Sequence, residues 1–260
     1  LQANADGASR RRRHGHGDEL IQLPTTEAVL FDKDGTLSRS DGFLSALAQA
    51  RALCCAELSA DPSITAPLLR AYGLRNGQLD PCGSTAVASR HDNLISTATV
   101  LAAAGHSWGQ ARQWAQTALD QADAQLAGSK AQRTPPLPGL RPALEQWHSQ
   151  GLKLAVISSD LGPSLEAFLQ THGLRHLFCA VHGAERSPRK PDPAAALALC
   201  HELGVAPQRC GLIGDAADDL AMAAAAGLGW SLAFTGGWSV PLELEGSHGS
   251  LATWTESPSL

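Results

Sequence analysis

Carboxylates end apolar stretches of this sequence at two places that lie far apart along the chain. Asp32 and Asp34 follow apolar residues 28–31, Asp215 ends a later apolar stretch, and Ser158 ends another one. Two carboxylates within hydrogen-bonding distance repel each other unless a cation lies between them. A site made of oxygen ligands favours a hard cation, and Mg²⁺ is the first choice. If Asp32 and Asp215 share one crevice, the sequence predicts a Mg²⁺ site.

Three further charged residues accompany these groups. Lys190 lies in the segment SPRKPDP, just before a predicted helix that begins near Pro193. A lysine beside the carboxylates would balance their charge, although a solvated side chain is the simpler interpretation of any single lysine. Asp218 and Asp219 open the helix that follows Asp215. Acidic residues suit the positive end of a helix dipole, so capping is the alternative interpretation of this pair.

The elements that would hold these residues alternate between strands and helices. Such alternation predicts a parallel sheet with helices on both faces, an α/β fold of the doubly wound class. The predicted strands are nearly all apolar, as expected when both faces of a sheet are covered. They cover residues 28–32, 152–158, 178–181, 210–215 and 229–234. Ligands of such sheets bind outside the carboxyl ends of the strands, where the polar residues named above stand.

A long helical block interrupts this alternation after the first strand. Residues 43–126 carry apolar residues at helical spacing, with a predicted loop at 75–85. The Gly- and Pro-rich segment 128–139 reads as a linker. The predicted organisation is a disordered leader over 1–23, an α/β catalytic core over 24–42 and 137–260, and a helical cap with its linker over 43–136.

Four motifs of this chain resemble those of the haloacid dehalogenase superfamily. FDKDGTL, which contains Asp32 and Asp34, is similar to the first motif, and Ser158 after KLAVI is similar to the second. Lys190 in KPDP resembles the third, and LIGDAADD with Asp215 and Asp219 resembles the fourth. The segment before the second motif looks like that of the phosphoglycolate phosphatase branch. The resemblance implies a Rossmann-like core with an inserted helical cap.

The resemblance also implies a role for each motif residue. Asp32 would be the nucleophile that forms an aspartyl-phosphate, and Asp34 would be the general acid and base. Mg²⁺ would bind Asp32, the main-chain carbonyl of Asp34, and Asp215. Ser158 and Lys190 would hold phosphate oxygens. The remaining motif residues would support these groups: Gly35, Thr36, Asp218 and Asp219.

Strand geometry gives a reason for the Asp-x-Asp-Gly spacing. Alternate residues of a strand point the same way, so Asp32 and Asp34 should face one site and Lys33 should point elsewhere. Gly35 would let the backbone leave the strand and approach a phosphate. Asp34 also discriminates within the superfamily, because cleavage of a carbon–halogen bond needs no acid at that position.

The implied function is a Mg²⁺-dependent phosphatase for a small phosphate monoester. A phosphomutase of the β-phosphoglucomutase type shares the motifs, and a non-catalytic phosphate-binding module is the alternative from another class. A doubly wound nucleotide-binding domain is disfavoured because no Gly-rich fingerprint follows the first strand. The substrate is not identified by the cap's basic residues, which are read as surface side chains: Arg51, Arg70, Arg75, Arg90 and His91.

The amino-acid composition indicates which partners and which cellular compartment to expect. A formal net charge of -5 argues against nucleic-acid binding. No apolar run reaches the ~20 residues of a membrane span, and no apolar stretch follows the arginine-rich start as a secretory signal would require. The six cysteines include no CxxC pair and suit a reducing compartment. We therefore expect a cytoplasmic enzyme that acts on a small molecule.

Overall fold

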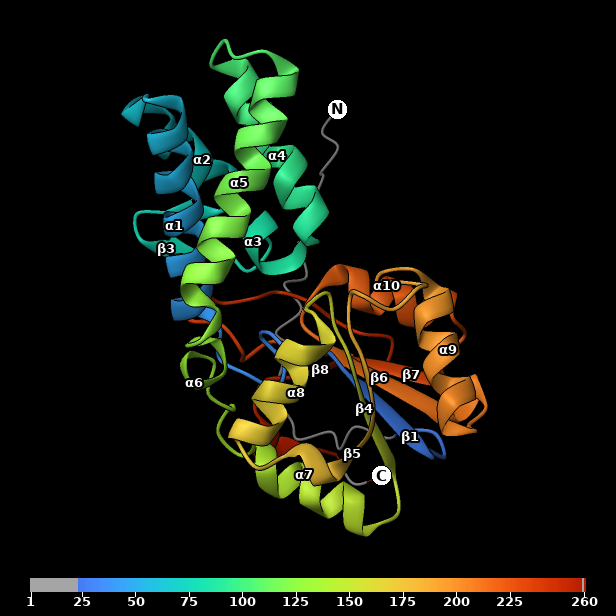
Figure 1. Ribbon diagram of the computed structural model, residues 1–260. Helices are drawn as coiled ribbons and strands as arrows, with labels where there is room; N and C mark the ends of the chain where they lie inside the picture. The colour runs from blue at the N-terminus through green and yellow to red at the C-terminus, as the bar shows by residue number, and fades with distance from the viewer. Residues whose placement is uncertain (1–22, 259) are drawn as a thin grey trace, which may run out of the picture.

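The first strand, β1 (Ala28–Phe31), lies in the middle of a six-stranded parallel sheet (Figure 1). In the computed structural model, which describes residues 23–258 and 260, the strand order is β5-β4-β1-β6-β7-β8. The other strands are β4 (Lys153–Ile157), β5 (Phe178–His182), β6 (Cys210–Gly214), β7 (Trp230–Phe234) and β8 (Ser250–Leu251). The chain winds from β1 first to one edge and then to the other, which confirms the doubly wound α/β prediction.

Alternation along β1 sends its side chains into two separate cores. Val29 and Phe31 pack with the helices on one face, and Ala28 and Leu30 pack with those on the other. All four are fully buried. The core helices are α7 (Leu140–Ser149), α8 (Gly162–Thr171), α9 (Pro193–Leu203) and α10 (Ala217–Ala225). Helices α7 and α8 belong to the first core, and α9 and α10 to the second.

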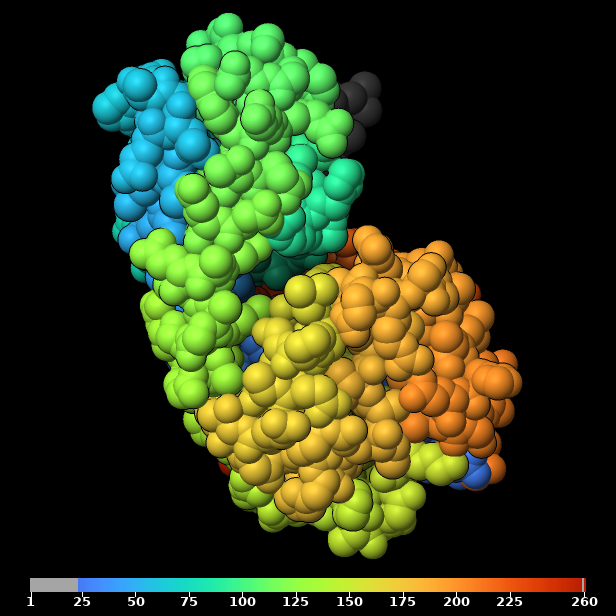
Figure 2. Space-filling view, in the orientation of Figure 1, coloured from blue at the N-terminus to red at the C-terminus, as the bar shows by residue number. Residues whose placement is uncertain are grey.

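Residues 41–127, here called the insertion, form a second lobe that stands apart from the sheet (Figures 1 and 2). Its helices are α1 (Asp41–Ser59), α2 (Thr65–Ala71), α3 (Ser84–Val87), α4 (Arg90–Ala103) and α5 (Trp108–Ala127), and α6 (Lys130–Arg133) follows in the linker. Ser89 and Asp92 make a capping box at the start of α4, and Ser107 accepts a hydrogen bond from the main-chain N–H of Gln110 in α5. The lobe has its own apolar cluster.

Two parts of the insertion and its linker differ from the sequence prediction. The predicted loop at 75–85 instead holds most of a small hairpin, β2 (Leu74–Arg75) and β3 (Gln78–Leu79), and the start of α3. Asn76 and Gly77 both have positive φ, which closes a two-residue hairpin turn. The predicted linker contains the one-turn helix α6. Both elements are too short for a periodic pattern to reveal.

The predicted leader lies outside the described residues, apart from Leu23. Short 3-10 helices complete the described chain at Pro62–Ile64, Arg175–Leu177, Pro207–Arg209 and Trp254–Glu256. Within residues 23–258 and 260, no helix has the length and apolar character needed to cross a membrane.

Candidate active site

The sheet order places three of the predicted site residues side by side. Strand β1 lies between β4 and β6, so Asp32, Ser158 and Asp215 end neighbouring strands. The Asp32 N–H donates to the main-chain oxygen of Ile213 at 3.0 Å, which continues the pairing of β1 with β6 past the end of the strand. This position, where the strand order reverses, is the crevice in which doubly wound sheets bind ligands.

Three carboxylates and one lysine form the centre of this site. One carboxylate oxygen each from Asp32, Asp215 and Asp219 lie within 4.8 Å of one another, and all three residues are buried. The Lys190 Nζ lies 2.5 Å from Asp32 Oδ1 and 2.5 Å from Asp219 Oδ1. The loop before α9 thus places the Lys190 ammonium group in contact with two of the three buried carboxylates.

The electrostatics of the cluster reflect this imbalance of charge. Burial raises the pKa of Asp32 to about 6, even though Lys190 opposes the shift. Burial, together with the nearby charges of Asp32 and Asp219, also raises the pKa of Asp215 well above its ordinary value. Burial alone would lower the pKa of Lys190, but the carboxylates of Asp219 and Asp32 outweigh it and raise that pKa. The cluster therefore has an affinity for further positive charge.

The donor set of this cluster fits a hard divalent cation. The converging ligand atoms of Asp32, Asp215 and Asp219 are all carboxylate oxygens. Mg²⁺ prefers oxygen donors and is usually bound by one or two carboxylates. An ion bound there would supply the positive charge that Lys190 alone does not provide.

The raised pKa of Asp32 predicts a pH-dependent effect on stability. The folded state holds the Asp32 proton more tightly than the unfolded state, so the free energy of unfolding falls as the pH rises from about 4 to about 6. In the absence of metal, Asp32→Asn should therefore be more stable than wild type at pH 7.5, by on the order of 2 kcal/mol. The two proteins should converge near pH 4. Urea unfolding in EDTA measures this, and an Asp32→Asn variant that is less stable than wild type at pH 7.5 would contradict the charge assignment.

Asp34 lies in a polar network of its own. The Lys33 Nζ contacts Asp34 Oδ1 at 2.7 Å, and the Ser40 hydroxyl donates to the same oxygen. Burial would raise the pKa of Asp34, but Lys33, Lys130 and the Ser40 hydrogen bond outweigh it and lower the pKa to about 2. Asp34 is thus a firmly ionised carboxylate, in contrast to Asp32.

The prediction that Lys33 points away from its neighbouring carboxylates is wrong. Lys33 is 1% exposed, and its ammonium group pairs with Asp34 and lies 5.4 Å from the centre of the Phe168 ring. The strand ends at Phe31, and the main-chain oxygen of Lys33 then accepts the N–H groups of a tight turn. Strand alternation therefore no longer sets side-chain directions at residues 33 and 34.

Asp215 is held by donors on both of its carboxylate oxygens. The Thr36 hydroxyl donates to Oδ1 at 2.9 Å, and the Trp238 indole N–H donates to Oδ2 at 2.7 Å. Gly35 has a φ of +78°, and a Cβ there would overlap both the Trp238 ring and Asp215 Oδ2. No motif of the sequence marks Trp238, which follows Gly-Gly just beyond the carboxyl end of β7.

The remaining predicted residues have different surroundings. Ser158 is 4% exposed, and its hydroxyl accepts the N–H of Asp160 at 3.2 Å. Asp219 is fully buried and both caps α10, by accepting the Ala216 N–H at 3.2 Å, and contacts Lys190. Asp218 is exposed on the first turn of the same helix. Only Asp219 of this acidic pair belongs to the central cluster.

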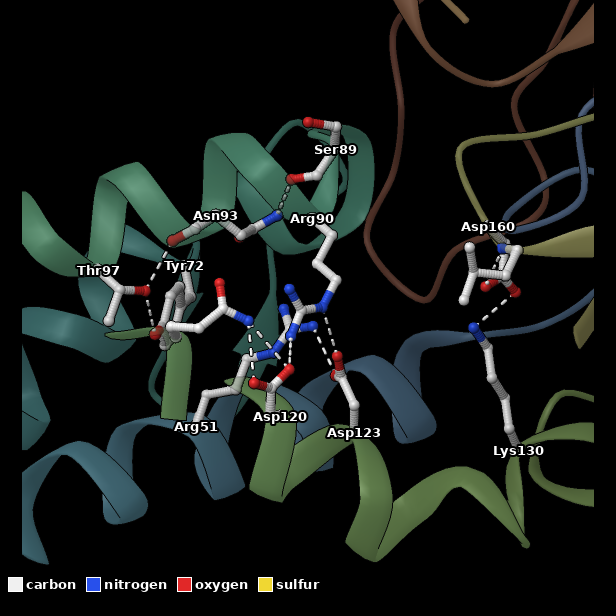
Figure 3. A network of polar contacts seen from close by, with 12 residues as sticks. Arg51, Tyr72, Ser89, Arg90, Asn93, Thr97, Asp120, Asp123, Lys130 and Asp160 are labelled. Atoms are coloured by element: carbon white, nitrogen blue, oxygen red, sulfur yellow. Dashed lines mark hydrogen bonds and ion pairs between the residues drawn. The ribbon is translucent and has the colours of Figure 1, made fainter. Parts of the chain in front are cut away.

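A charged network in the insertion lies near the linker (Figure 3). Arg51 and Arg90 both contact Asp123, at 2.9 and 2.8 Å, and Lys130 of α6 contacts Asp160 of the core at 2.6 Å. Arg51 is 5% exposed, so its interpretation as a surface residue is wrong. A buried arginine needs a carboxylate partner, and α5 supplies one at a position that sequence spacing does not reveal.

Comparison with known proteins agrees with this geometry. The model of the haloacid dehalogenase-like hydrolase family matches residues 26–227. A phosphoglycolate phosphatase of Rhodospirillum rubrum is 32% identical over 204 residues, covering 78% of this chain and 77% of the relative. One from Cereibacter sphaeroides is 34% identical over 128 residues, covering 47% of this chain and 56% of the relative. The chain belongs to the haloacid dehalogenase-like hydrolase family. Within that family, the chain resembles the phosphoglycolate phosphatases.

Solved structures share the fold at low sequence identity. A predicted phosphoglycolate phosphatase from Haemophilus somnus has a TM-score of 0.62 at 20% identity, covering 85% of this chain and 91% of that one. A hydrolase of the same superfamily from Geobacter sulfurreducens has a TM-score of 0.57 at 20% identity, covering 89% and 94%. The chain spans about half the length of the first curated relatives that it matches.

Proposed function

We propose that this chain is a Mg²⁺-dependent phosphatase that hydrolyses a small phosphate monoester through an aspartyl-phosphate on Asp32. The observation that carries the proposal is the buried cluster at the carboxyl end of β1. There Asp32 Oδ1 lies 2.5 Å from Lys190 Nζ, and a carboxylate oxygen of Asp32 lies within 4.8 Å of one from Asp215 and one from Asp219. A carboxylate at a strand end, next to a cation and two further acids, suits nucleophilic attack on phosphorus.

Each residue of the site has a defined task in this proposal. The carboxylate of Asp32 attacks phosphorus, and the bond to the leaving alcohol breaks. Lys190 and the Ser158 hydroxyl bind phosphate oxygens. When bound, Mg²⁺ would be held by Asp32, Asp215 and the main-chain carbonyl of Asp34, and would neutralise charge on the transferring phosphoryl group.

Asp34 has the chemistry of a general base in its present surroundings. With a pKa of about 2 it is ionised at neutral pH, which suits the removal of a proton from the water that attacks the intermediate. The negative charge of an arriving phosphate ester raises the pKa of a nearby carboxyl group. That rise is the change Asp34 needs in order to protonate the leaving oxygen in the first step.

A panel of phosphate esters tests the proposal. Purified protein with Mg²⁺ should release inorganic phosphate from at least one small ester, and phosphoglycolate is the first candidate because of the relatives described above. Conversion of a sugar phosphate to its isomer without phosphate release would instead identify a mutase. Phosphate binding without either reaction would identify a non-catalytic module.

The insertion is proposed to act as a cap that confers substrate selectivity. Asp32, Ser158, Lys190 and Asp215 all lie outside it, so chemistry and selectivity should separate. Replacing residues 43–126 with a short Gly/Ser linker should raise KM for the preferred ester at least ~10-fold at saturating Mg²⁺, because remote binding energy is lost. The difference in kcat/KM between good and poor esters should also become smaller.

The control for this replacement is a cooperative thermal melt, since the change exposes apolar surface of the core. A cooperatively folded variant that keeps the wild-type substrate ranking would place selectivity in the core.

A further inference from the structure

Trp238 reaches the candidate active site from a loop that no motif marks. The loop follows β7, whose carboxyl end lies beside that of β6, the strand that ends before Asp215. The Trp238 side chain is buried, at 6% exposure, and its indole N–H donates to Asp215 Oδ2 at 2.7 Å. A buried indole N–H usually finds one acceptor, and here that acceptor is a proposed metal ligand.

The indole completes a clamp on Asp215. Thr36 donates to Oδ1 and Trp238 to Oδ2, so each oxygen receives one hydrogen bond and keeps a lone pair. There is little space around this contact. A Cβ at Gly35 would overlap the Trp238 ring and Asp215 Oδ2, and a Cβ at Gly237 would overlap the main chain of Gly35. A carboxylate that accepts a hydrogen bond on each oxygen is held in one orientation. A fixed orientation suits a cation such as Mg²⁺, which requires a strict coordination geometry.

The same loop is attached to the insertion. Trp238 belongs to the apolar cluster of the insertion, together with Phe43, Leu44 and Leu47 of α1. The next residue, Ser239, donates its main-chain N–H to Asp41 Oδ1 at 2.8 Å, in the first turn of α1. The indole therefore contacts the insertion with its apolar surface and Asp215 with its only polar atom.

We propose that Trp238 is a positioning residue that couples the packing of the insertion to the orientation of the metal ligand Asp215. The proposal rests on the proposed function for its metal ion. When α1 is seated on the loop, the indole is held against Asp215 and the carboxylate is ready to bind Mg²⁺. When this packing loosens, the hydrogen bond on Oδ2 is lost and the site binds Mg²⁺ less tightly.

Mg²⁺ titration calorimetry on the full chain tests the proposal without any turnover. Trp238→Phe keeps an aromatic ring and removes the N–H, so its Kd for Mg²⁺ should rise about tenfold, the effect expected for one hydrogen bond to a charged group. Trp147→Phe is the matched control. Its indole N–H donates to the main-chain oxygen of Pro258 at 3.0 Å, within the core of the sheet domain. Its Kd should stay within about twofold of wild type, because the hydrogen bond that it loses involves none of the proposed metal ligands.

A double-mutant cycle tests the coupling to the insertion. Asp41→Ala removes the acceptor of the Ser239 N–H. It should raise the Kd for Mg²⁺ about threefold in the wild-type background and leave it unchanged in the Trp238→Phe background, because the coupled contact is already lost. An equal effect of Asp41→Ala in both backgrounds would overturn the coupling.

Indole NMR keeps the proposal testable if Trp238→Phe does not fold. The chain has six tryptophans, so ¹⁵N labelling of their indoles gives six N–H signals. Mg²⁺ should shift the Trp238 signal far more than the signals of Trp147 and Trp230, whose indoles donate to Pro258 and Thr26. A uniform response, or equal Kd values for Trp238→Phe and wild type, would overturn the role of Trp238. A chain that binds Mg²⁺ as predicted but releases no phosphate would overturn the proposed function alone.

Discussion

Asp32→Asn is expected to release no measurable phosphate from an ester that wild type hydrolyses, a loss of at least about four orders of magnitude. The amide has the shape of the carboxylate and can still accept a hydrogen bond from Lys190, which lies 2.5 Å from Asp32 Oδ1. It lacks the negative charge and the lone-pair nucleophilicity needed to attack phosphorus. The measurement is phosphate release at saturating ester and Mg²⁺.

The matched control for this variant is Asp218→Asn. Asp218 carries the same side chain near the same edge of the sheet, but it is exposed and stands outside the buried cluster. We expect its activity to stay within about twofold of wild type, as is usual for surface substitutions. Substantial activity in the Asp32 variant, or an equal loss in both variants, would exclude Asp32 as the nucleophile.

Removal of divalent metal is the second change for which a very large effect is expected. Asp32, Asp215 and Asp219 gather three buried carboxylates around a single lysine. A dianionic phosphate approaching this cluster without a bound cation would meet strong repulsion, so excess EDTA should reduce phosphate release by about a thousandfold or more.

The metals added back after EDTA treatment should differ in how much activity they restore. Mg²⁺ should restore full activity, and Ca²⁺ should restore little, because it takes more ligands at longer distances in looser geometry. Zn²⁺ should be a poor substitute, since no cysteine or histidine joins Asp32, Asp215 and Asp219 in the cluster that the described residues form. Full activity in excess chelator would show that Lys190 alone provides the necessary charge.

The sequence was sufficient to predict the sheet and most of its polar edge. Apolar stretches that end in Asp32, Ser158 and Asp215 signal buried parallel strands, and parallel strands present their carboxyl ends on one edge. Whether these three strands are neighbours depends on the strand order, which cannot be read from the sequence. The structure supplies it by placing β1 between β4 and β6.

The parts that could not be predicted depend on contacts between distant segments. Trp238 meets Asp215 only because β6 and β7 are adjacent and the loop after β7 turns toward the insertion. Arg51 is buried because α5 places Asp123 beside it. Lys33 departs from strand alternation because the strand ends two residues before it. Periodicity carries no information about any of these contacts.

Chemical trapping of the phosphorylated enzyme is the most direct test of the central claim, that Asp32 is the nucleophile. Wild type turning over its ester in Mg²⁺ is quenched rapidly in acid and treated with borohydride, which reduces an acyl phosphate to an alcohol. Peptide mass spectrometry should find homoserine at position 32, with Asp34 and Asp215 unchanged. Reduction at another carboxylate, or turnover with no trapped residue under conditions that trap a known aspartyl-phosphate, would contradict it.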